Sequence, residues 1–301
     1  MSKISFKNPD YKANENTKME IEKLHSEGNS LDEFHLKHAD MKNAKLVNLK
    51  MTNSDLTRSD FSNASMYGAN LEGSNLFKTN FEGANLKSAN MQNCNLLGAD
   101  FSNTKLNNVN WGKEYKVINE KEAEVSHSKG NTIESREKYK EAEDIYRTLK
   151  ISLQNQTLGD DVGKIFEREM ICKRKQLSIF SPLRFMSKLA HVTTGYGEKV
   201  GNIFYTIVFV IIACACAFGI VGVSYQNHVL GFFGDIEFFG NMLNVIGNLL
   251  YFSVVVFSTV GFGDIAPINL LGKSIVVFEG LAGSIILAIL IIALYKKLMD
   301  R

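Results

Sequence analysis

The chain has 301 residues, enough for two or three domains, and a formal net charge of +2 at pH 7. A chain so close to neutrality is, as a whole, neither polyacidic nor polybasic. Its charges are nevertheless unevenly distributed. Residues 200–234 contain no Asp, Glu, Lys or Arg, and residues 265–295 contain only Lys273 and Glu279, whereas residues 112–200 are dense in both signs. The sequence therefore predicts a soluble half joined to a membrane half.

The chemistry-bearing residues form no pattern typical of an enzyme. The four cysteines, Cys94, Cys172, Cys214 and Cys216, lack the spacing of a metal site. Cys214 and Cys216 would lie about 200° apart around a helix, so we interpret them as packing residues. No nucleotide-binding loop or catalytic constellation is recognisable, and we expect neither enzymatic activity nor a cofactor. Because the N-terminus is polar, we expect no cleavable signal peptide.

A period of five residues runs through the first third of the chain without a change of register. The large apolar residues of this period are Leu31, Leu36, Met41, Leu46, Met51, Leu56, Phe61, Met66, Leu71, Leu76, Phe81, Leu86, Met91, Leu96, Phe101, Leu106 and Trp111. The small residues two positions earlier are Ala39, Ala44, Ser54, Ser59, Ala64, Ala69, Ser74, Thr79, Ala84, Ala89, Cys94, Ala99 and Thr104. This period matches neither the 3.6 residues of a helix nor the 2.0 of a strand. It is typical of a chain that turns a corner every five residues, with about twenty residues in each square coil.

The pattern resembles the pentapeptide-repeat family, a right-handed quadrilateral β-helix. The resemblance implies that residues 31–112 form about four stacked coils behind a polar N-terminal segment, residues 1–30, and that Trp111 helps to cap the last coil. Some members of the family mimic DNA with an acidic surface. Residues 31–111 contain eight Asp or Glu and eight Lys or Arg, so we expect no such mimicry and no nucleic-acid partner. The stacked coils would form a rod. This rod can serve as a spacer, an assembly surface or a sensor that binds an unidentified ligand or protein.

Residues 113–132 are polar, and we expect an irregular linker there. Helical spacing begins near Ile133. One apolar stripe contains Ala142, Ile145, Tyr146, Leu149 and Leu153, and a second contains Val162, Ile165, Phe166 and Met170. Because Gly159 interrupts the pattern, we expect a cytoplasmic helical hairpin over residues 133–178. It either links the rod to the membrane half or binds a partner protein.

A basic juxtamembrane segment, residues 179–200, precedes the first of two apolar stretches. Residues 201–225 and 269–297 are each long enough to cross a bilayer of about 30 Å. Basic residues precede the first span, and Lys296 and Lys297 end the second, so we expect both termini in the cytoplasm. The basic run can also be interpreted as a nucleic-acid patch, but its position beside a membrane span favours the orientation signal. An extracellular loop over 226–244 then follows the first span.

Between the spans, a short apolar stretch at 245–258 leads into Thr259, Val260, Gly261, Phe262, Gly263 and Asp264. Two glycines at alternate positions permit backbone conformations that are closed to other residues. Successive carbonyls can then point the same way and replace the water shell of a potassium ion, as in the known potassium-channel filter. Residues 195–297 accordingly resemble the potassium-channel family, with Phe262 where many members carry Tyr.

The resemblance implies an all-α two-transmembrane pore domain with a re-entrant loop, assembled from four identical chains around one axis. A pore helix at 245–258, capped by Asn241 or Asn244, would lead into a K⁺ filter. The ion-binding carbonyls would come from Thr259, Val260, Gly261, Phe262 and Gly263, and Asp264 would lie at the outer mouth. Some relatives place a Glu behind the filter where this chain has Val255, and many carry a Trp pair where it has Tyr251 and Phe252. Because Phe252 has no donor to offer, we expect Asp264 to lack a partner.

Three residues of the second span are candidates for gating or stability. Gly283 lies at the position of the hinge glycine of the family, and Gly280 can share that role, although glycine in a membrane helix also permits close packing. Glu279 is the single acid deep in the span; it either bonds to the back of the pore helix or responds to pH. No residue run resembles a voltage sensor, and only six residues follow Tyr295, so we expect any cytoplasmic gating input to come from residues 1–200.

The sequence thus predicts a homotetrameric, potassium-selective channel of bacterial type in the cell inner (plasma) membrane. Conduction would be passive, K⁺ and membrane lipids would be its partners, and the repeat domain would modulate gating. Two alternatives remain. The first is a non-selective cation channel on the same fold. The second is a membrane-tethered pentapeptide-repeat binding module.

Overall fold

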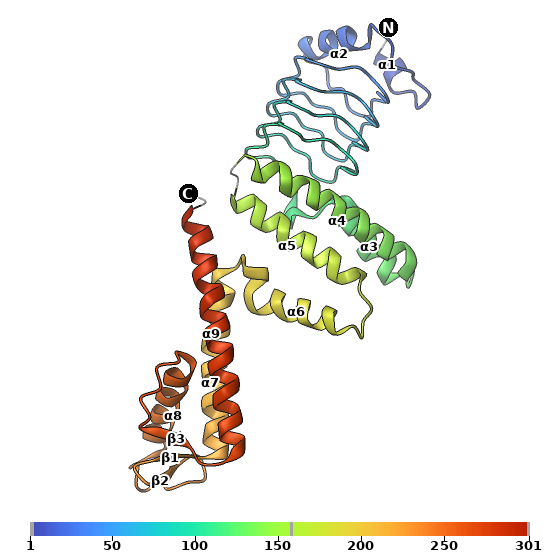
Figure 1. Cartoon of the computed structure of the whole chain (residues 1–301). Coiled ribbons are helices and arrows are strands. Elements are labelled where there is room, and N and C mark those ends of the chain that lie inside the picture. The colour runs from blue at the N-terminus through green and yellow to red at the C-terminus, as the bar shows by residue number, and fades with distance from the viewer. Residues whose placement is uncertain (1–2, 157–158, 300–301) are drawn as a thin grey trace. The chain divides into compact units, whose positions relative to one another are not determined.

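The computed structural model describes residues 3–156 and 159–299. They divide into two compact units, the first ending at Lys188 and the second beginning at Leu189. The first unit opens with two short helices, α1 (Lys3–Phe6) and α2 (Thr17–Ser26). They place Phe6 and Ile21 in the core, with the Phe6 ring stacked on Phe34 at 5.3 Å. The N-terminal segment is therefore more than a polar extension, because it covers the apolar end of the first coil (Figure 1).

Stacked coils with a period of twenty residues follow. Parallel bridges join each residue to the residue one coil later, as in Asp40 to Asp60 and Asn70 to Asn90. Near each corner, the second residue after the large apolar one has a positive φ, with few exceptions. Asn is the commonest there, as at Asn43 with φ of 57°, and Gly also occurs. Both residue types tolerate this left-handed conformation, which explains why the repeat favours them.

The interior of the coils contains the apolar residues at the period of five. Phe61, Phe81 and Phe101 stack in successive coils at centroid distances of 5.7 and 5.6 Å, and Trp111 meets Phe101 edge-on at 6.2 Å. Small polar residues in the core are satisfied by backbone one coil away. For example, the Thr104 hydroxyl donates to the Phe81 carbonyl at 2.7 Å. The core is therefore apolar without leaving such hydroxyls unpaired.

The expected irregular linker at 113–132 is wrong. A 3₁₀ turn, η1 (Lys113–Tyr115), leads into helix α3 (Ile118–Ser128). The buried face of α3 is mostly polar, since it contains Asn119, Glu120 and Ser126 beside Ala123. An apolar period could not reveal such a helix, because its burial depends on polar partners in other helices.

Those partners lie in α4 (Thr132–Gln154), which packs on both α3 and α5, and in α5 (Gly159–Gln176). Glu120 accepts hydrogen bonds from Arg168 at 2.6 Å and from the Tyr146 hydroxyl at 2.6 Å. Burial raises the pKa of the Glu120 carboxyl, and the Arg168 guanidinium opposes that shift. One apolar core continues from Phe6 through the coils to Cys172 of α5.

Helix α6 (Pro182–Thr194) and a 3₁₀ turn, η2 (Gly195–Gly197), precede the first long apolar helix, α7 (Val200–Val221). The span predicted to end at 225 is shorter, because Gly222 has φ of 78° and ends the helix. A small antiparallel sheet follows in the order β2-β1-β3. Its strands are β1 (Val223–Tyr225), β2 (His228–Leu230) and β3 (Ile265–Pro267).

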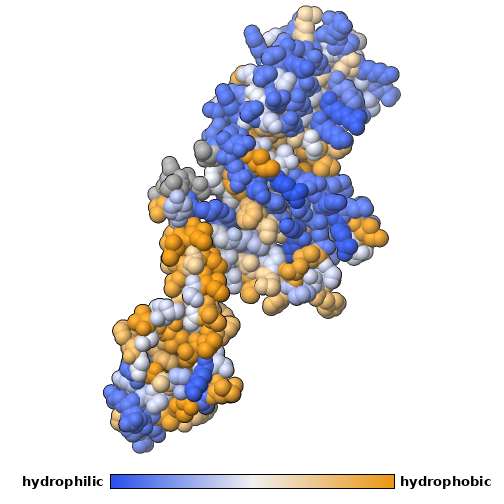
Figure 2. Space-filling view, viewed as in Figure 1, coloured by the Kyte–Doolittle hydropathy of each residue, from blue (hydrophilic) through white to orange (hydrophobic). Residues whose placement is uncertain are grey.

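The second unit is completed by α8 (Met242–Phe257) and α9 (Leu270–Met299). Helix α8 packs against both α7 and α9, which also contact each other (Figure 1). Two helices are long and apolar enough to cross a membrane, namely Val200–Val221 and Leu270–Leu298. Figure 2 shows hydrophobic residues gathered on the visible face of this unit. By length and apolar composition, both helices are candidate membrane spans.

Candidate functional site

Helix α8 is fixed at its N-terminus by a side-chain cap. The Asn241 side chain accepts the backbone N–H of Asn244 at 2.9 Å, so Asn241 is the N-cap and Asn244 lies inside the helix. The cap satisfies one of the N–H groups that a helix start leaves unpaired. With 16 residues, the helix is about 24 Å long, too short to cross a bilayer on its own.

The C-terminus of α8 ends in a closed backbone turn. The Thr259 N–H donates to the Val256 carbonyl at 2.9 Å, and the Val260 N–H donates to the Val255 carbonyl at 3.1 Å. This pair of bonds is a Schellman motif, with Thr259 in the left-handed position at φ of 58°. A β-branched residue in that region costs roughly 1–2 kcal/mol. Backbone strain of this kind is concentrated at functional sites, so Thr259 is a candidate functional residue.

The predicted filter residues continue this geometry. Positive φ values recur at alternate positions, at Thr259, Gly261 (58°) and Gly263 (79°), whereas Val260 and Phe262 are not among the residues with positive φ. The segment then enters β3 at Ile265, which pairs with Tyr225 of β1. It is therefore held at one end by a helix and at the other by a sheet strand.

The six residues from Thr259 to Asp264 are exposed in the single chain; the Phe262 side chain, for example, is 68% exposed. The Tyr251 hydroxyl lies near the Asp264 carboxylate. Asp264 therefore has a polar neighbour, against the expectation that it lacks one. That neighbour is Tyr251 and not Phe252, whose ring is buried against Phe218 at 4.8 Å.

Glu279 lies behind α8 and is fully buried. Its carboxylate accepts a hydrogen bond from the Ser253 hydroxyl of α8. Ser253 Oγ also lies 2.8 Å from the Ile211 carbonyl of α7, and the Cys214 thiol lies beside the carboxylate. The acid of the second span thus joins three helices at one point. Val255, where some relatives carry Glu, is buried on the same helix.

The two candidate hinge glycines differ in their surroundings. A methyl group built on Gly283 would collide with the Phe257 carbonyl at the end of α8. At Gly280 the nearest atom to such a methyl is the Val256 carbonyl oxygen at 3.9 Å, an ordinary contact. Helix α9 is continuous through both positions. Gly283 therefore permits close packing of α9 on the end of α8, and this favours the packing alternative.

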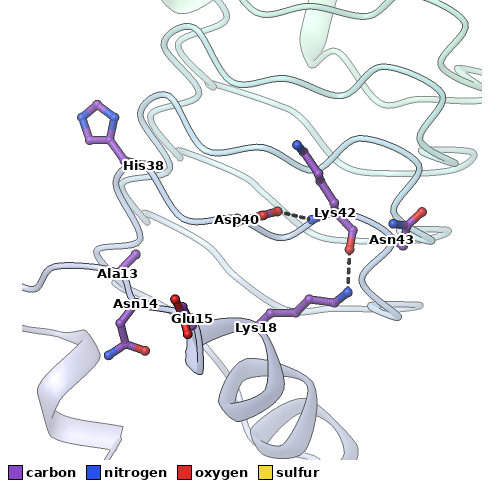
Figure 3. A pocket seen from close by; sticks show the side chains of 8 residues that line it. All are labelled: Ala13, Asn14, Glu15, Lys18, His38, Asp40, Lys42 and Asn43. Atoms are coloured by element: carbon purple, nitrogen blue, oxygen red, sulfur yellow. Dashed lines mark hydrogen bonds between the residues drawn. The ribbon is translucent and has the colours of Figure 1, made fainter.

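A separate hollow lies at the N-terminal end of the repeat coils (Figure 3). It has a volume of about 560 Å³ and is lined by Ala13, Asn14, Glu15, Lys18, His38, Asp40, Lys42 and Asn43. The Lys18 ammonium donates to the Lys42 carbonyl at 2.6 Å, and the Lys42 N–H donates to Asp40 at 3.2 Å. The lining is of mixed charge and partly paired, so it defines no ligand class.

The comparisons with known proteins agree with this division of the chain. A family model described as an ion channel matches residues 206–300. A model for pentapeptide repeats, in eight copies, matches residues 28–58, 39–77 and 74–110. The chain therefore joins an ion-channel domain to an array of pentapeptide repeats. No curated protein sequence matches it.

Several solved structures of pentapeptide-repeat proteins are similar to this chain. One, from the thylakoid lumen of Arabidopsis thaliana, is 24% identical; the match covers 25% of this chain and 48% of that one, with a TM-score of 0.19. Another, from the cyanobacterium Cyanothece 51142, is 28% identical over 27% of this chain and 55% of its own, with a TM-score of 0.15. A third, from Nostoc Pcc 7120, is 28% identical over 29% and 74% respectively, with a TM-score of 0.18.

Proposed function

We propose that the chain is the subunit of a potassium-selective channel that conducts K⁺ passively. The observation that carries the proposal is the alternation of positive φ at Thr259, Gly261 and Gly263 directly after a capped short helix. This alternation lets carbonyls from Thr259 to Gly263 face one side. Rings of such carbonyls replace the hydration shell of K⁺.

The electrostatics of α8 support the same role. Its carboxyl end, at Phe257, leads directly into the proposed filter. The C-terminus of a helix has a partial negative charge, which favours a cation nearby. Asp264, at the other end of the segment, would add carboxylate charge at the outer mouth and raise the local concentration of cations. Tyr251 would hold that carboxylate in place through its hydroxyl.

We further propose that four copies surround one axis. Irregular backbone at membrane depth is tolerated only where protein buries it or where it lines a cavity. In the single chain Val260 is 55% exposed and Phe262 is 68% exposed. Neighbouring subunits would cover these side chains and leave the carbonyls facing a shared pore. The re-entrant loop would then run from α8 through the filter to β3.

The orientation follows from the ends of the two spans. Lys296 near the end of α9 pairs with Glu198 just before α7, which supports placing these two ends on the same side of the membrane. Basic residues on that side favour the cytoplasm. We therefore propose a multi-pass protein of the cell inner (plasma) membrane whose soluble unit and both termini are cytoplasmic.

The repeats would form a right-handed quadrilateral β-helix, since bridges join residues twenty apart and corners recur every five. In this orientation they lie on the cytoplasmic side, where they can modulate gating. Their apolar core continues into the helices α3–α5, so removal of the repeats would expose that core. Their contribution is therefore best tested by substitutions in the full chain.

Ion selectivity is the direct test of the proposal. The full-length chain in planar bilayers, between potassium and sodium solutions, should reverse near the potassium equilibrium potential. A reversal potential near zero would instead indicate a non-selective cation channel.

Gly261→Ala should abolish the potassium current, because the added methyl disfavours the positive φ of 58°. Gly247→Ala is the matched control, since nothing lies within 4 Å of a methyl built there and its φ is not in the positive range. Wild-type current in the Gly261 variant would refute the filter assignment.

A further inference from the structure

The neutral total charge of the repeats conceals a sorting of charge between the sides of the coils. Each coil of twenty residues contains four segments of five, and each segment is centred on a buried apolar residue. We call the segments 44–48, 64–68, 84–88 and 104–108 the basic side, and the segments 39–43, 59–63, 79–83 and 99–103 the acidic side. In every coil the acidic segment leads directly into the basic one, so the two sides meet at a shared corner.

The two sides carry opposite charge. The basic side contains no Asp or Glu, and its charged residues are Lys45, Lys87 and Lys105. The acidic side contains a single base, Lys42, and its acids are Asp40, Asp60, Glu82 and Asp100. Lys42 pairs with Asp60 at 3.4 Å. Among residues 3–156 and 159–299, no other ion pair involves a charged residue of either side, so most of this charge is available to another molecule.

The basic side also exposes apolar surface. Tyr67 and Val47 lie on it in successive coils and are 46% and 44% exposed. The residue of the acidic side that corresponds to Tyr67 in the same coil is Ser62, which is small and buried. A projecting aromatic ring among lysines, matched by a flat side with small and acidic residues, suits a polar contact with one aromatic anchor.

A ring of four copies requires contact sides that meet at a corner. In a ring closed by rotation, each copy contacts its two neighbours through two different patches. For four copies the rotation is a quarter turn, so these two patches must face directions at right angles. Adjacent sides of a four-sided coil meet that condition, and the basic and acidic sides are adjacent in every coil.

The charges also match in height along the stack. A quarter turn about an axis parallel to the stack involves no translation, so each coil lies level with the same coil of the neighbouring copy. Each lysine of the basic side is then level with an acid of its neighbour, in the pairs Lys45 with Asp40, Lys87 with Glu82, and Lys105 with Asp100. The side that follows the basic one in the chain offers no such match, because it would place Lys45 level with Lys50.

We propose that the repeats of neighbouring subunits bind one another in a ring of four, the basic side of one chain against the acidic side of the next. The occupant of each side is a second copy of this chain, and complementary charge is the argument for it. The proposal rests on the four-copy assembly of the proposed channel. Four coils at about 4.8 Å spacing give a side only about 20 Å high, so this small contact forms where the pore already holds the copies together.

Cross-linking between two differently tagged chains tests which sides meet. Cys216 is exposed and the other three cysteines are buried, so Cys216→Ser supplies a background without exposed thiols. In that background, Asn107→Cys marks the basic side and Ser102→Cys marks the acidic side of the same coil, and no charged residue is altered. Gln92→Cys, at the same position of the repeat on a third side, is the control. The full-length chains are co-expressed in pairs, purified in detergent and treated with a short bismaleimide.

The pair Asn107→Cys and Ser102→Cys should give at least about fivefold more cross-linked product than Asn107→Cys with Gln92→Cys, and neither marked chain should cross-link to itself. Equal products in the two pairs would overturn the proposal. Cross-linking of Asn107→Cys to itself would also overturn it, because it would indicate a twofold contact. Light scattering gives the mass of the same sample. A tetramer without the specific cross-link would refute the side pairing alone, whereas a monomer would refute the channel assembly as well.

Charge reversal tests the physical origin of the contact. Adding Lys105→Glu to the Asn107→Cys chain should reduce the cross-linked product about fivefold at low salt, because it opposes Glu to Asp100 of the neighbour. Adding Asp100→Lys to the Ser102→Cys chain should then restore the product. A chain that had simply unfolded would not be rescued by a change in its neighbour. No loss, or loss without rescue, would overturn the charge pairing.

Discussion

Ser253 of α8 donates a hydrogen bond to Glu279 of α9, and both side chains are fully buried. Ser253 Oγ also lies 2.8 Å from the Ile211 carbonyl of α7. An acid in an apolar environment is costly unless it is hydrogen-bonded. The Ser253 hydroxyl therefore compensates the buried acid and links α8 to both α7 and α9.

Ser253→Ala should destabilise the membrane unit. The change removes a donor from a buried carboxyl group, which costs about 1–3 kcal/mol. We expect a lower melting temperature of the detergent-purified chain and faster dissociation of its oligomer. Ser274→Ala is the control, because the Ser274 hydroxyl is exposed and bonds only to the Leu270 carbonyl of its own helix among the contacts of the described residues. Equal melting temperatures for the two variants would show that the Ser253 bond is energetically unimportant.

The repeat region was the most predictable part of the fold. Every large residue in the period of five, from Leu31 to Trp111, is buried, because the register is a local property that repeats along the chain. Helix α3 was not predictable in the same way. Its burial depends on Glu120 meeting Arg168, which is 48 residues away. A single-sequence pattern contains no information about such a partner.

The candidate site was predictable in its residue types and less so in its contacts. The Thr259–Asp264 motif and the short preceding helix followed from sequence, because glycine spacing and apolar length are local. The proximity of Tyr251 to Asp264 and the contact of Gly283 with Phe257 depend on how α8 packs and turns. The strands around the loop were missed since each has only three residues, too few to show an alternating pattern.

Leu86→Asp should unfold or fray the repeat coils. Leu86 is fully buried, and an unpaired charge there costs several kcal/mol. Limited proteolysis of the full-length chain should show cleavage within the repeats at protease concentrations that leave the wild type intact. Lys87→Asp introduces the same residue one position later, at a partly exposed site, and should remain resistant. Similar cleavage of both variants would contradict the inward register at Leu86.

Asp32→Asn should change how the stability of the first unit depends on pH. Burial tends to raise the pKa of Asp32, but hydrogen bonds from Ser30 and Thr52 and the charge of Lys50 outweigh it and lower the pKa to about 2. A carboxyl group with a lowered pKa stabilises the folded state above its ordinary value of 3.8, and this stabilisation is lost as the pH falls through about 2.

The melting temperature of the wild type should therefore exceed that of Asp32→Asn at pH 6, and the difference should shrink between about pH 4 and pH 2. Thr52→Val removes a hydroxyl that donates to Asp32 at 2.7 Å and should weaken the same pH dependence. Circular dichroism melts at a series of pH values measure both effects. A difference that is constant with pH would show that Asp32 acts through packing alone.

Gly283→Ala and Gly280→Ala separate a hinge from a packing contact in α9. Both changes raise the helix propensity by about the same amount, roughly 1 kcal/mol per subunit. If flexibility of α9 governed opening, the two substitutions would lower the open probability alike.

The contacts lead to a different expectation, because only the methyl on Gly283 would collide with backbone, at the Phe257 carbonyl. That carbonyl belongs to the last residue of α8, two residues before Thr259, so a displacement there would reach the proposed filter directly. Gly283→Ala should therefore reduce both the potassium current and the thermal stability of the oligomer, whereas Gly280→Ala should leave both near the wild type. Single-channel recording with parallel melting measurements decides between the two, and equal loss of open probability at unchanged stability would identify the glycines as a hinge.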